Sequence, residues 1–342
     1  MAGMGGTRRA WWLALALIAA ATPALAEPPS AVILMYHRFG EDDIPSTNIR
    51  LAQFERHLAI LASPAYHVLP LPEVVAALAA GRPLPDRTVA ITVDDAYASV
   101  YREAWPRLRA AGFPFTLFVA TDAVGGGRRM MRWDQIRELA AAGVTIGNHS
   151  ASHAHMAYRD AATNRADIAR ATARLTAELG ATPKLFAYPY GEYSTALREV
   201  VAASGFTAAF GQHSGVAFAG GDRYALPRFA LNQHFGTAKR FRLVVDALPL
   251  TVSEVTPSDP LLGRNPPPFG FTVAAGVGDL GKLDCYPSNG AAARIQRLGA
   301  RRVEVRITAP FPPGRSRVNC TMPATDGRWR WFGMQFLVPP PS

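Results

Sequence analysis

Short apolar runs that alternate with helical segments are the feature that most constrains the fold of this chain. Between residues 30 and 248, several runs rich in Val, Ile, Leu and Phe have the composition of buried strands. The segments between them place apolar residues at helical spacing, and most of them end at glycine. The expected strands are 32–35, 68–69, 88–95, 115–119, 144–147, 185–188 and 206–210, and the expected helices are 54–61, 72–80, 105–111, 134–142, 164–179, 194–203 and 237–248. This order predicts a parallel sheet, and about seven such units over this length favour a closed or nearly closed α/β barrel.

Polar and aromatic clusters follow the expected strands. They are Tyr36-His37, Asp94-Asp95, Asn148-His149 and Pro189-Tyr190-Gly191. In parallel barrels the reactive groups gather at the C-terminal ends of the strands. We therefore expect these four clusters to converge on one face and to form the functional site.

Two adjacent carboxylates, Asp94 and Asp95, end the apolar run Thr88–Ile91. Like charges this close cannot both ionise cheaply unless a partner neutralises them. A bound cation is one solution, in which one Asp ligates the ion and the other stays free as a base. The alternative is an Asp that caps the next helix while its neighbour is solvated.

Two imidazoles, His149 and His153, lie four residues apart just past an expected strand. On a helical turn this spacing puts both on one side, within reach of one ion. His and carboxylate ligands suit Zn²⁺, and a site with three protein ligands leaves a position for water. Together with the Asp pair on a neighbouring strand end, the two histidines favour a metal site over ordinary core or surface histidines.

Three motifs in order carry a family resemblance: Thr92-Val93-Asp94-Asp95, His149-Ser150-x-x-His153, and Phe186-Ala187-Tyr188-Pro189-Tyr190-Gly191. Over roughly residues 30–247 the chain resembles the NodB-homology polysaccharide deacetylases, carbohydrate esterase family 4. The resemblance implies a distorted (β/α)7 barrel. It also implies that Asp95, His149 and His153 hold the metal, that Asp94 is the base that activates water, and that the Tyr190 backbone N–H binds the oxyanion.

The sequence lacks the family's usual residues for two functions, the orientation of the base and general-acid catalysis. Ala187 stands where the family has an Arg that orients the base, and Arg228 is the candidate substitute. The family's motifs for the general acid are not visible, so His213 is the candidate acid and His234 the second choice. We expect the substrate-binding side chains to be Tyr36, His37, Tyr188 and Arg228.

The chain is expected to divide into four parts: a signal peptide over 1–26, the deacetylase domain over 27–248, a Pro-rich linker over 249–268, and a small β-sandwich-like domain over 269–342. A helix over 291–298 is the one candidate helix in the last part. Cys285 and Cys320 could form one disulfide there in an oxidising compartment. The aromatic residues Trp329, Trp331 and Phe332 are expected in its core, although polymer binding by this domain is the alternative.

The leader and the charge point to an exported, periplasmic or extracellular protein without a transmembrane span after signal removal. Removing 1–26 takes away Arg8 and Arg9 and no acid, so the formal charge falls from +10 to +8 (34 basic minus 26 acidic residues). Such a protein is attracted to anionic envelope polymers, and no Lys-rich tract suggests nucleic acid. The expected function is metal-dependent N-deacetylation of an N-acetylhexosamine polysaccharide, such as poly-N-acetylglucosamine, a chitin-like polymer or peptidoglycan. The alternatives are an O-acetyl polysaccharide esterase and a carbohydrate-binding pseudoenzyme.

Overall fold

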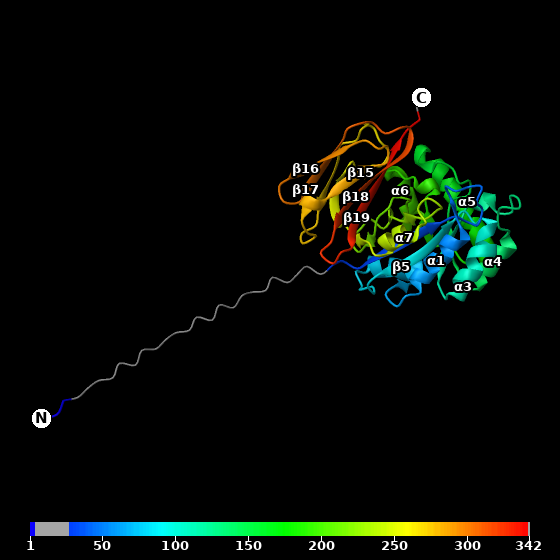
Figure 1. Cartoon of the computed structure of the whole chain (residues 1–342). Coiled ribbons are helices and arrows are strands. Elements are labelled where there is room, and N and C mark those ends of the chain that lie inside the picture. The colour runs from blue at the N-terminus through cyan, green and yellow to red at the C-terminus, as the bar shows by residue number, and fades with distance from the viewer. Residues whose placement is uncertain (4–26, 341–342) are drawn as a thin grey trace.

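A curled, mostly parallel sheet with helices outside it forms the first domain, and antiparallel strands form the second (Figure 1). The computed structural model describes residues 1–3 and 27–340. The expected signal peptide therefore lies, apart from its first three residues, outside the described part. None of the helices within the described residues has the length and apolarity to cross a membrane.

The first sheet has nine strands, and its main path runs β10-β1-β5-β6-β7-β8-β9. All neighbours along it are parallel except β10, which is antiparallel to β1. The strands of this domain are β1 Ser30–Tyr36, β4 His67–Val68, β5 Thr88–Asp94, β6 Phe115–Val119, β7 Thr145–Asn148, β8 Leu185–Ala187, β9 Ala208–Phe210, β10 Ala217–Phe218 and β11 Phe229–Ala230, with a separate pair β2 Arg38–Phe39 and β3 Asn48–Ile49.

One segment brings the two ends of the curled sheet together. Leu226 bridges to Phe210 of β9, and β11 pairs in parallel with β1 only a few residues later. The chain from 226 to 230 therefore spans the gap between the last strand and the first. This arrangement confirms the expected distorted, incompletely closed barrel.

The helices lie where the apolar spacing predicts them, to within a few residues. Their bounds are α1 Leu51–Leu61, α2 Leu71–Ala79, α3 Trp105–Ala110, α4 Trp133–Ala141, α5 Ala161–Leu179, α6 Thr195–Ala203 and α7 Ala238–Val245, with a π-helical turn Val100–Ala104 and 3₁₀ turns Thr121–Ala123, Met156–Tyr158, Pro189–Gly191 and, in the second domain, Leu280–Lys282. Local chemistry sets their ends. In α5, for example, the Asp160 side chain accepts hydrogen bonds from the first turn, and Gly180 ends the helix with a left-handed φ of 70°.

The second domain consists of two four-stranded sheets, ordered β12-β19-β18-β15 and β13-β14-β17-β16. Their strands are β12 Leu248–Pro249, β13 Val252–Thr256, β14 Phe269–Val273, β15 Asp284–Pro287, β16 Ala293–Leu298, β17 Arg302–Ile307, β18 Gly314–Pro323 and β19 Trp329–Val338. A common apolar core that includes Phe271, Val303, Val318 and Phe336 joins the two sheets. The expected disulfide is present, because Cys285 of β15 lies directly opposite Cys320 of β18.

Two expectations about this half of the chain are wrong. The stretch 249–268 is not a free linker, because β13 pairs with β14 and both Leu250 and Leu262 are buried in the second core. Residues 291–298 do not form a helix, because β16 pairs along its whole length with β17. The partly buried Ile295 of β16 packs against the second core, so the apolar spacing there has the period of a strand.

Candidate active site and metal centre

The two carboxylates of the Asp pair point to different partners. Asp94 is the last residue of β5, whereas Asp95 has a left-handed φ of 77°. This backbone turn at a non-glycine residue carries the second side chain away from the sheet toward the neighbouring strand end. Both side chains are largely buried. The division of roles expected for the two residues therefore has a structural basis.

The histidine pair lies in a loop after β7 and not on a helical turn. Ser150 and His153 both have positive φ, 65° and 52°, which folds the loop back so that both imidazoles face Asp95. The Nε2 atoms of His149 and His153 lie 3.3 and 3.1 Å from Asp95 Oδ1. The three ligand atoms all lie within 4.8 Å of one another.

The residues of this cluster fit a divalent metal. His149 Nδ1 donates to the Ala187 carbonyl at 2.7 Å, which leaves the Nε2 lone pair free to face the cluster. His149 Nε2 and Asp95 Oδ1 are buried without a hydrogen-bond partner of good geometry. Burial raises the pKa of Asp95, but the two histidines outweigh it and hold that pKa well below its ordinary value. An anionic carboxylate with two imidazoles is a donor set suited to Zn²⁺.

Arg228 binds the other carboxylate. Its Nη1 and Nη2 donate to Asp94 Oδ1 and Oδ2 at 2.7 and 2.8 Å, and both side chains are completely buried. Nε donates to the Gly211 carbonyl at 2.9 Å, and Nη1 also donates to Thr92 Oγ1 at 3.1 Å. Burial raises the pKa of Asp94, but the guanidinium charge outweighs it and lowers the pKa. The structure thus brings Arg228 to the position of a base-orienting residue, although its burial leaves no surface for the substrate contact that we also expected.

His37 is the additional imidazole beside Asp94. It follows β1, and its Nε2 lies 4.0 Å from Asp94 Oδ2. Its side chain is 13% exposed, so it borders both the buried carboxylate and the open part of the site. Burial lowers the pKa of His37, against the opposing charges of Asp95 and Asp94. His37 is therefore the imidazole that lies next to Asp94 and also borders the open part of the site.

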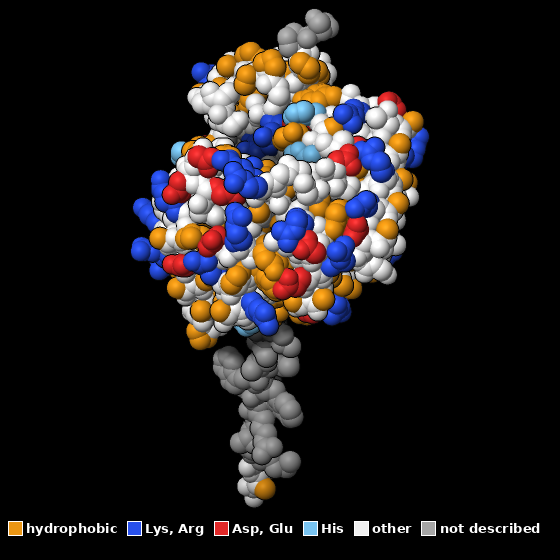
Figure 2. Space-filling view, turned by 90° about the vertical axis from the view of Figure 1, so that its right-hand side faces the viewer, with side chains coloured by type: hydrophobic (Ala, Val, Ile, Leu, Met, Phe, Trp, Pro, Cys, Tyr) orange, Lys and Arg blue, Asp and Glu red, His pale blue; other side chains and the backbone are white. Residues whose placement is uncertain are grey.

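Tyr190 lies in a tight turn at the edge of the cluster. Its φ and ψ are 58° and 4°, and the turn's hydrogen bonds are donated by the N–H groups of Gly191 and Glu192, not by that of Tyr190. Its ring stacks on His155 at 4.1 Å and meets His153 edge-on at 4.5 Å. Histidine side chains border a surface recess that also holds Lys or Arg side chains (Figure 2).

The second domain holds this turn from the other side. Arg315 of β18 donates from Nη1 to the Tyr190 carbonyl at 2.5 Å, and Gln335 of β19 donates to the Gly191 carbonyl at 2.8 Å. Arg315 Nε also lies 3.6 Å from the carboxylate of buried Glu192. These contacts are not visible in the sequence, because no local pattern indicates which β-domain side chain faces the barrel.

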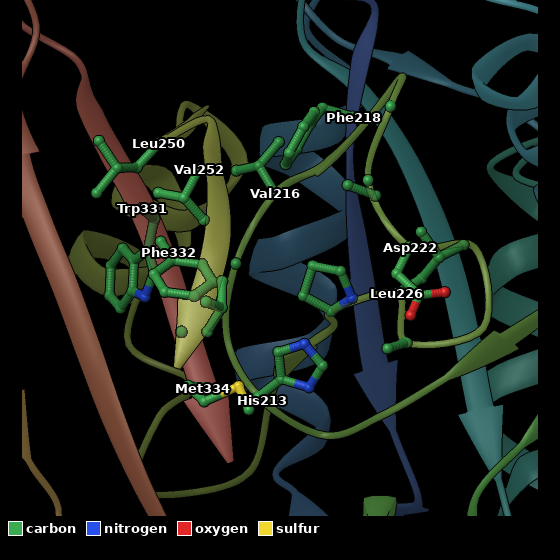
Figure 3. Close-up of a pocket in the computed structure, with 18 of the residues that line it drawn as sticks. His213, Val216, Phe218, Asp222, Leu226, Leu250, Val252, Trp331, Phe332 and Met334 are labelled. Carbon is green, nitrogen blue, oxygen red and sulfur yellow. The ribbon is translucent and has the colours of Figure 1, made fainter. Parts of the chain in front are cut away.

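The structure does not bring His213 to the Asp94–His153 cluster. Its ring is buried in a separate pocket between the two domains, among side chains that include Val216, Leu226, Trp331 and Met334 (Figure 3). Burial, with the nearby charges of Arg317 and Arg228, lowers the pKa of His213 to about 4. Among the described residues, no hydrogen bond or ion pair joins the His213 ring to Asp94 or Asp95, so His213 is poorly placed to act beside that carboxylate pair. His234, the second choice, is in an exposed loop where its backbone N–H donates to Asn232.

Tyr36 and Tyr188 lie in the core and not at the substrate face. Each ring is at most 1% exposed. The Tyr36 hydroxyl pairs with His57 Nδ1 at 2.9 Å, and the Tyr188 hydroxyl donates to the Tyr224 carbonyl at 2.9 Å. Tyr36 ends β1 and Tyr188 directly follows β8, and both side chains are turned inward, so we assign them to packing.

One supporting carboxylate was missed from the sequence. Asp167 of α5 accepts hydrogen bonds at Oδ1 from the backbone N–H groups of Ala151 and Ser152, at 2.7 and 3.2 Å, and at Oδ2 from the Ser152 hydroxyl at 2.5 Å. It therefore fixes the loop between the two metal-site histidines. The signal in the sequence was weak, because Asp167 is one of two polar residues, with Asn164, at the helical positions that otherwise carry the apolar residues of α5.

Comparisons with known proteins agree with this site. Residues 81–209 match the family model "Polysaccharide deacetylase". The chain is 24% identical over 202 residues to the putative polysaccharide deacetylase YxkH of Bacillus subtilis, covering 59% of this chain and 71% of that protein. It is 26% identical over 241 residues to poly-β-1,6-N-acetyl-D-glucosamine N-deacetylase of Escherichia coli, covering 56% of this chain but only 36% of that enzyme.

Solved structures show the same barrel. The structure of IcaB from Ammonifex degensii has a TM-score of 0.56 and 28% identity, covering 64% of this chain and 98% of that one. The Streptococcus pyogenes deacetylase PplD has a TM-score of 0.59 and 20% identity, covering 64% and 99% of the two chains.

Fold and site together define the class of this protein: a curled (β/α) barrel with an Asp-His-His cluster at the C-terminal ends of its strands. Residues 81–209 of the barrel carry the match to the polysaccharide deacetylase domain, the barrel has the NodB-like fold of the solved deacetylases, and an all-β domain follows it.

Proposed function

We propose that this protein is an exported, metal-dependent N-deacetylase of an N-acetylhexosamine polysaccharide, with Zn²⁺ as the ion. The observation that carries the proposal is the separation of two adjacent carboxylates, Asp95 facing two imidazoles and Asp94 held by Arg228. The enzymes that the chain resembles include a poly-N-acetylglucosamine N-deacetylase. A divalent ion held by Asp95, His149 and His153 would supply Lewis acidity and a lowered pKa for water.

The residues of this chain then take complementary roles in amide hydrolysis. Asp94, kept ionised and in place by Arg228, accepts a proton from the attacking water as the new C–O bond forms. The Tyr190 N–H donates to the oxyanion that develops on the carbonyl oxygen. His37 passes this proton from Asp94 to the nitrogen as the C–N bond breaks, which releases acetate and an amine. We assign this role to His37 in place of His213 because His37 borders Asp94.

The test compares two neighbouring substitutions. Asp94→Asn should keep the metal content but lower acetate release by at least about 100-fold, because only proton transfer is removed. Asp95→Asn should lower both the metal content and acetate release, because it removes one of the three protein ligands. Metal content is measured by elemental analysis, and acetate and amine are assayed on acetylated oligosaccharides. Equal metal loss in both variants would contradict this division of roles.

The leaving group separates the amidase from an esterase. An amine leaves poorly without a proton, whereas an activated aryl oxide needs little help. His37→Ala should therefore reduce amide hydrolysis far more than hydrolysis of an aryl acetate, and His234→Ala should change neither. Acetate release from O-acetylated but not from N-acetylated oligosaccharides by the unmodified protein would replace the proposal with the O-acetyl esterase. Bound metal without turnover on either would indicate the pseudoenzyme.

A further inference from the structure

Exposed aromatic side chains are concentrated along one groove outside the metal centre. Among the described residues, the large apolar side chains that stand exposed are Phe235, Leu243, Tyr286, Trp329, Leu298 and Met1. The first four line two adjoining hollows between the barrel and the second domain. These hollows share Arg240, Leu243 and Trp329, so they form one continuous groove. The hollow that contains Phe235 and Tyr286 has a volume of about 480 Å³ and supplies most of the aromatic lining. We call it the interdomain groove.

Both domains contribute to the walls of the interdomain groove. One wall is α7 and the loop before it, with Phe235 and Arg240, and the other is formed by β15, β18 and β19. Tyr286 is 55% exposed and Trp329 40% exposed. Exposing these flat apolar rings to solvent does not stabilise the folded protein. Several of them gathered in one groove therefore indicate a binding surface. Asn319 and Thr321 add hydrogen-bonding groups between the rings.

Two arginines in the interdomain groove have no acidic partner. Arg240 lies over the Phe235 and Trp331 rings, at 5.0 and 5.7 Å from their centroids, and Arg317 projects from β18. In the described part of the chain neither forms an ion pair with a carboxylate, and the Nε atom of each is buried without a hydrogen bond. Burial lowers the pKa of Arg240, and burial together with Arg315 lowers the pKa of Arg317 to about 10.

Those two guanidinium groups contrast with their neighbour Arg328. Arg328 is paired with Asp86 at 2.8 Å and with Asp326 at 2.6 Å, so its charge is already neutralised. Asp246, which also lines the groove, is engaged by Arg87 at 2.9 Å. The unneutralised charge facing the interdomain groove is therefore positive. A ligand that supplied carboxylates would pair with guanidinium charges that no carboxylate of the described residues neutralises.

The interdomain groove ends beside the active-site turn. Gln212 lines it and accepts a hydrogen bond from Arg315 Nη1 at 3.2 Å. The same Nη1 donates to the Tyr190 carbonyl. The interdomain groove and the Tyr190 turn are therefore linked through one side chain, Arg315.

We propose that the interdomain groove binds a carboxylate-bearing polysaccharide, with sugar rings stacked on Trp329 and Tyr286 and acidic groups paired with Arg240 and Arg317. The proposal rests on the proposed function, because it takes the occupant to be the glycan substrate. It narrows that substrate class to polymers in which N-acetylhexosamines alternate with acidic sugars or carry acidic substituents. It also predicts that a fully deacetylated, cationic product is repelled from the groove and does not compete for it.

The test measures binding and catalysis separately. The probes are a hexasaccharide of alternating N-acetylglucosamine and glucuronic acid, a neutral N-acetylglucosamine hexamer, and a capped oligoglutamate with the same number of carboxylates as the first. Affinity is measured by calorimetry at physiological salt. We expect the acidic hexasaccharide to bind about tenfold more tightly than the neutral one, and the oligoglutamate to bind more weakly than either because it has no sugar faces to stack.

Matched variants separate the contribution of ring stacking to saccharide affinity from that of charge pairing. Trp329→Ala and Tyr286→Ala should each lower the affinity for both hexasaccharides by about three- to tenfold. Arg317→Gln should remove the preference for the acidic hexasaccharide over the neutral one. Leu298→Ala and Arg297→Gln, on β16 and outside the groove residues, are the controls and should change nothing. Unfolding midpoints show that each variant is folded.

The outcomes separate this inference from the proposed function. Equal affinity of the two hexasaccharides, or oligoglutamate binding as tightly as the acidic one, would overturn the groove assignment. So would full affinity in both aromatic variants. Acidic-saccharide binding without acetate release from any acetylated sugar would keep the groove and reject the deacetylase.

Discussion

At the scale of single residues, function depends on which partner each polar side chain meets. Arg228, which we propose takes the place of the arginine that the third motif lacks, reaches Asp94 across 134 positions of sequence. Its fork contacts both carboxylate oxygens, so it fixes the rotation of the carboxylate as well as its charge.

Substituting Arg228 tests this orientation. Arg228→Lys keeps one positive charge but cannot bridge both oxygens, so we expect kcat to fall at least about tenfold with metal content unchanged. Arg228→Met leaves a buried carboxylate unpaired and should also lower the free energy of unfolding by about 3–5 kcal/mol. Steady-state kinetics, elemental analysis and urea unfolding are the measurements. A Lys variant with the kcat of the unmodified protein would mean that orientation of Asp94 does not limit catalysis.

Histidine burial also sets a pH dependence of stability. His57 is fully buried, stacks on Phe241 at 3.9 Å, and hydrogen-bonds through both ring nitrogens, to Tyr36 and to the Gly236 carbonyl. Burial lowers the pKa of His57 from 6.5 to about 4. Between these two values the unfolded chain binds the proton and the folded chain does not, so stability is complete above pH 6.5 and falls as the pH decreases toward 4.

We expect His57 to contribute up to about 3 kcal/mol to this loss of stability. The check is the free energy of unfolding in urea from pH 7 to pH 4 for the protein and for His57→Gln. The variant should show a shallower decline, while His213, which shares the low pKa, remains in both proteins. Parallel curves would show that His57 is not the group responsible.

At the scale of elements, the site is assembled where strand ends meet. β5, β7 and β8 supply Asp94, the histidine loop and the Tyr190 turn, because parallel strands end at one edge of the curled sheet. Two strands of the second domain complete it, since β18 and β19 provide the donors that hold the Tyr190 and Gly191 carbonyls. Tyr190 has a left-handed conformation that is unfavourable for a residue with a Cβ, so it depends on such contacts.

Arg315 is therefore expected to position the turn. Arg315→Ala should lower kcat about tenfold with little change in KM, because the Tyr190 N–H serves the developing oxyanion more than the bound substrate. Metal content should not change, and Arg315→Lys should recover part of the rate because an ammonium group can still reach the carbonyl. Arg297→Ala, on β16 and away from the turn, is the control. A change in KM alone would assign Arg315 to substrate binding.

At the scale of the whole molecule, the two domains are in direct contact. Trp331 of β19 is packed edge-on against Phe229 of β11, which links the second domain to the strand that closes the barrel. The disulfide Cys285–Cys320 joins β15 to β18, the strand that carries Arg315. Stability of the second domain and activity of the barrel should therefore be coupled.

The double variant Cys285→Ala/Cys320→Ala tests that coupling. The disulfide closes a loop with a sequence separation of 35, so its removal should lower the free energy of unfolding of the second domain by about 3–4 kcal/mol. Near the unfolding midpoint of that domain, acetate release should fall while the metal stays bound. In a background that carries Trp105→Phe and Trp133→Phe, tryptophan fluorescence follows the second domain, which contains Trp329 and Trp331. Full activity after this domain has unfolded would show that the barrel works alone.

The sequence by itself determined the barrel, its strand and helix positions, and the Asp-His-His cluster. These follow from short-range patterns: apolar runs fix strands, glycines end helices, and Asp94-Asp95 and His149-x-x-x-His153 lie within single loops. Only the tertiary structure decided which distant side chains serve the site. Tyr36 and Tyr188 turn into the core, His213 lies in another pocket, and Arg315 reaches the Tyr190 turn from 125 positions away. Side-chain direction at a strand end and contacts between domains depend on how the sheet curls and closes, and no local pattern records that geometry.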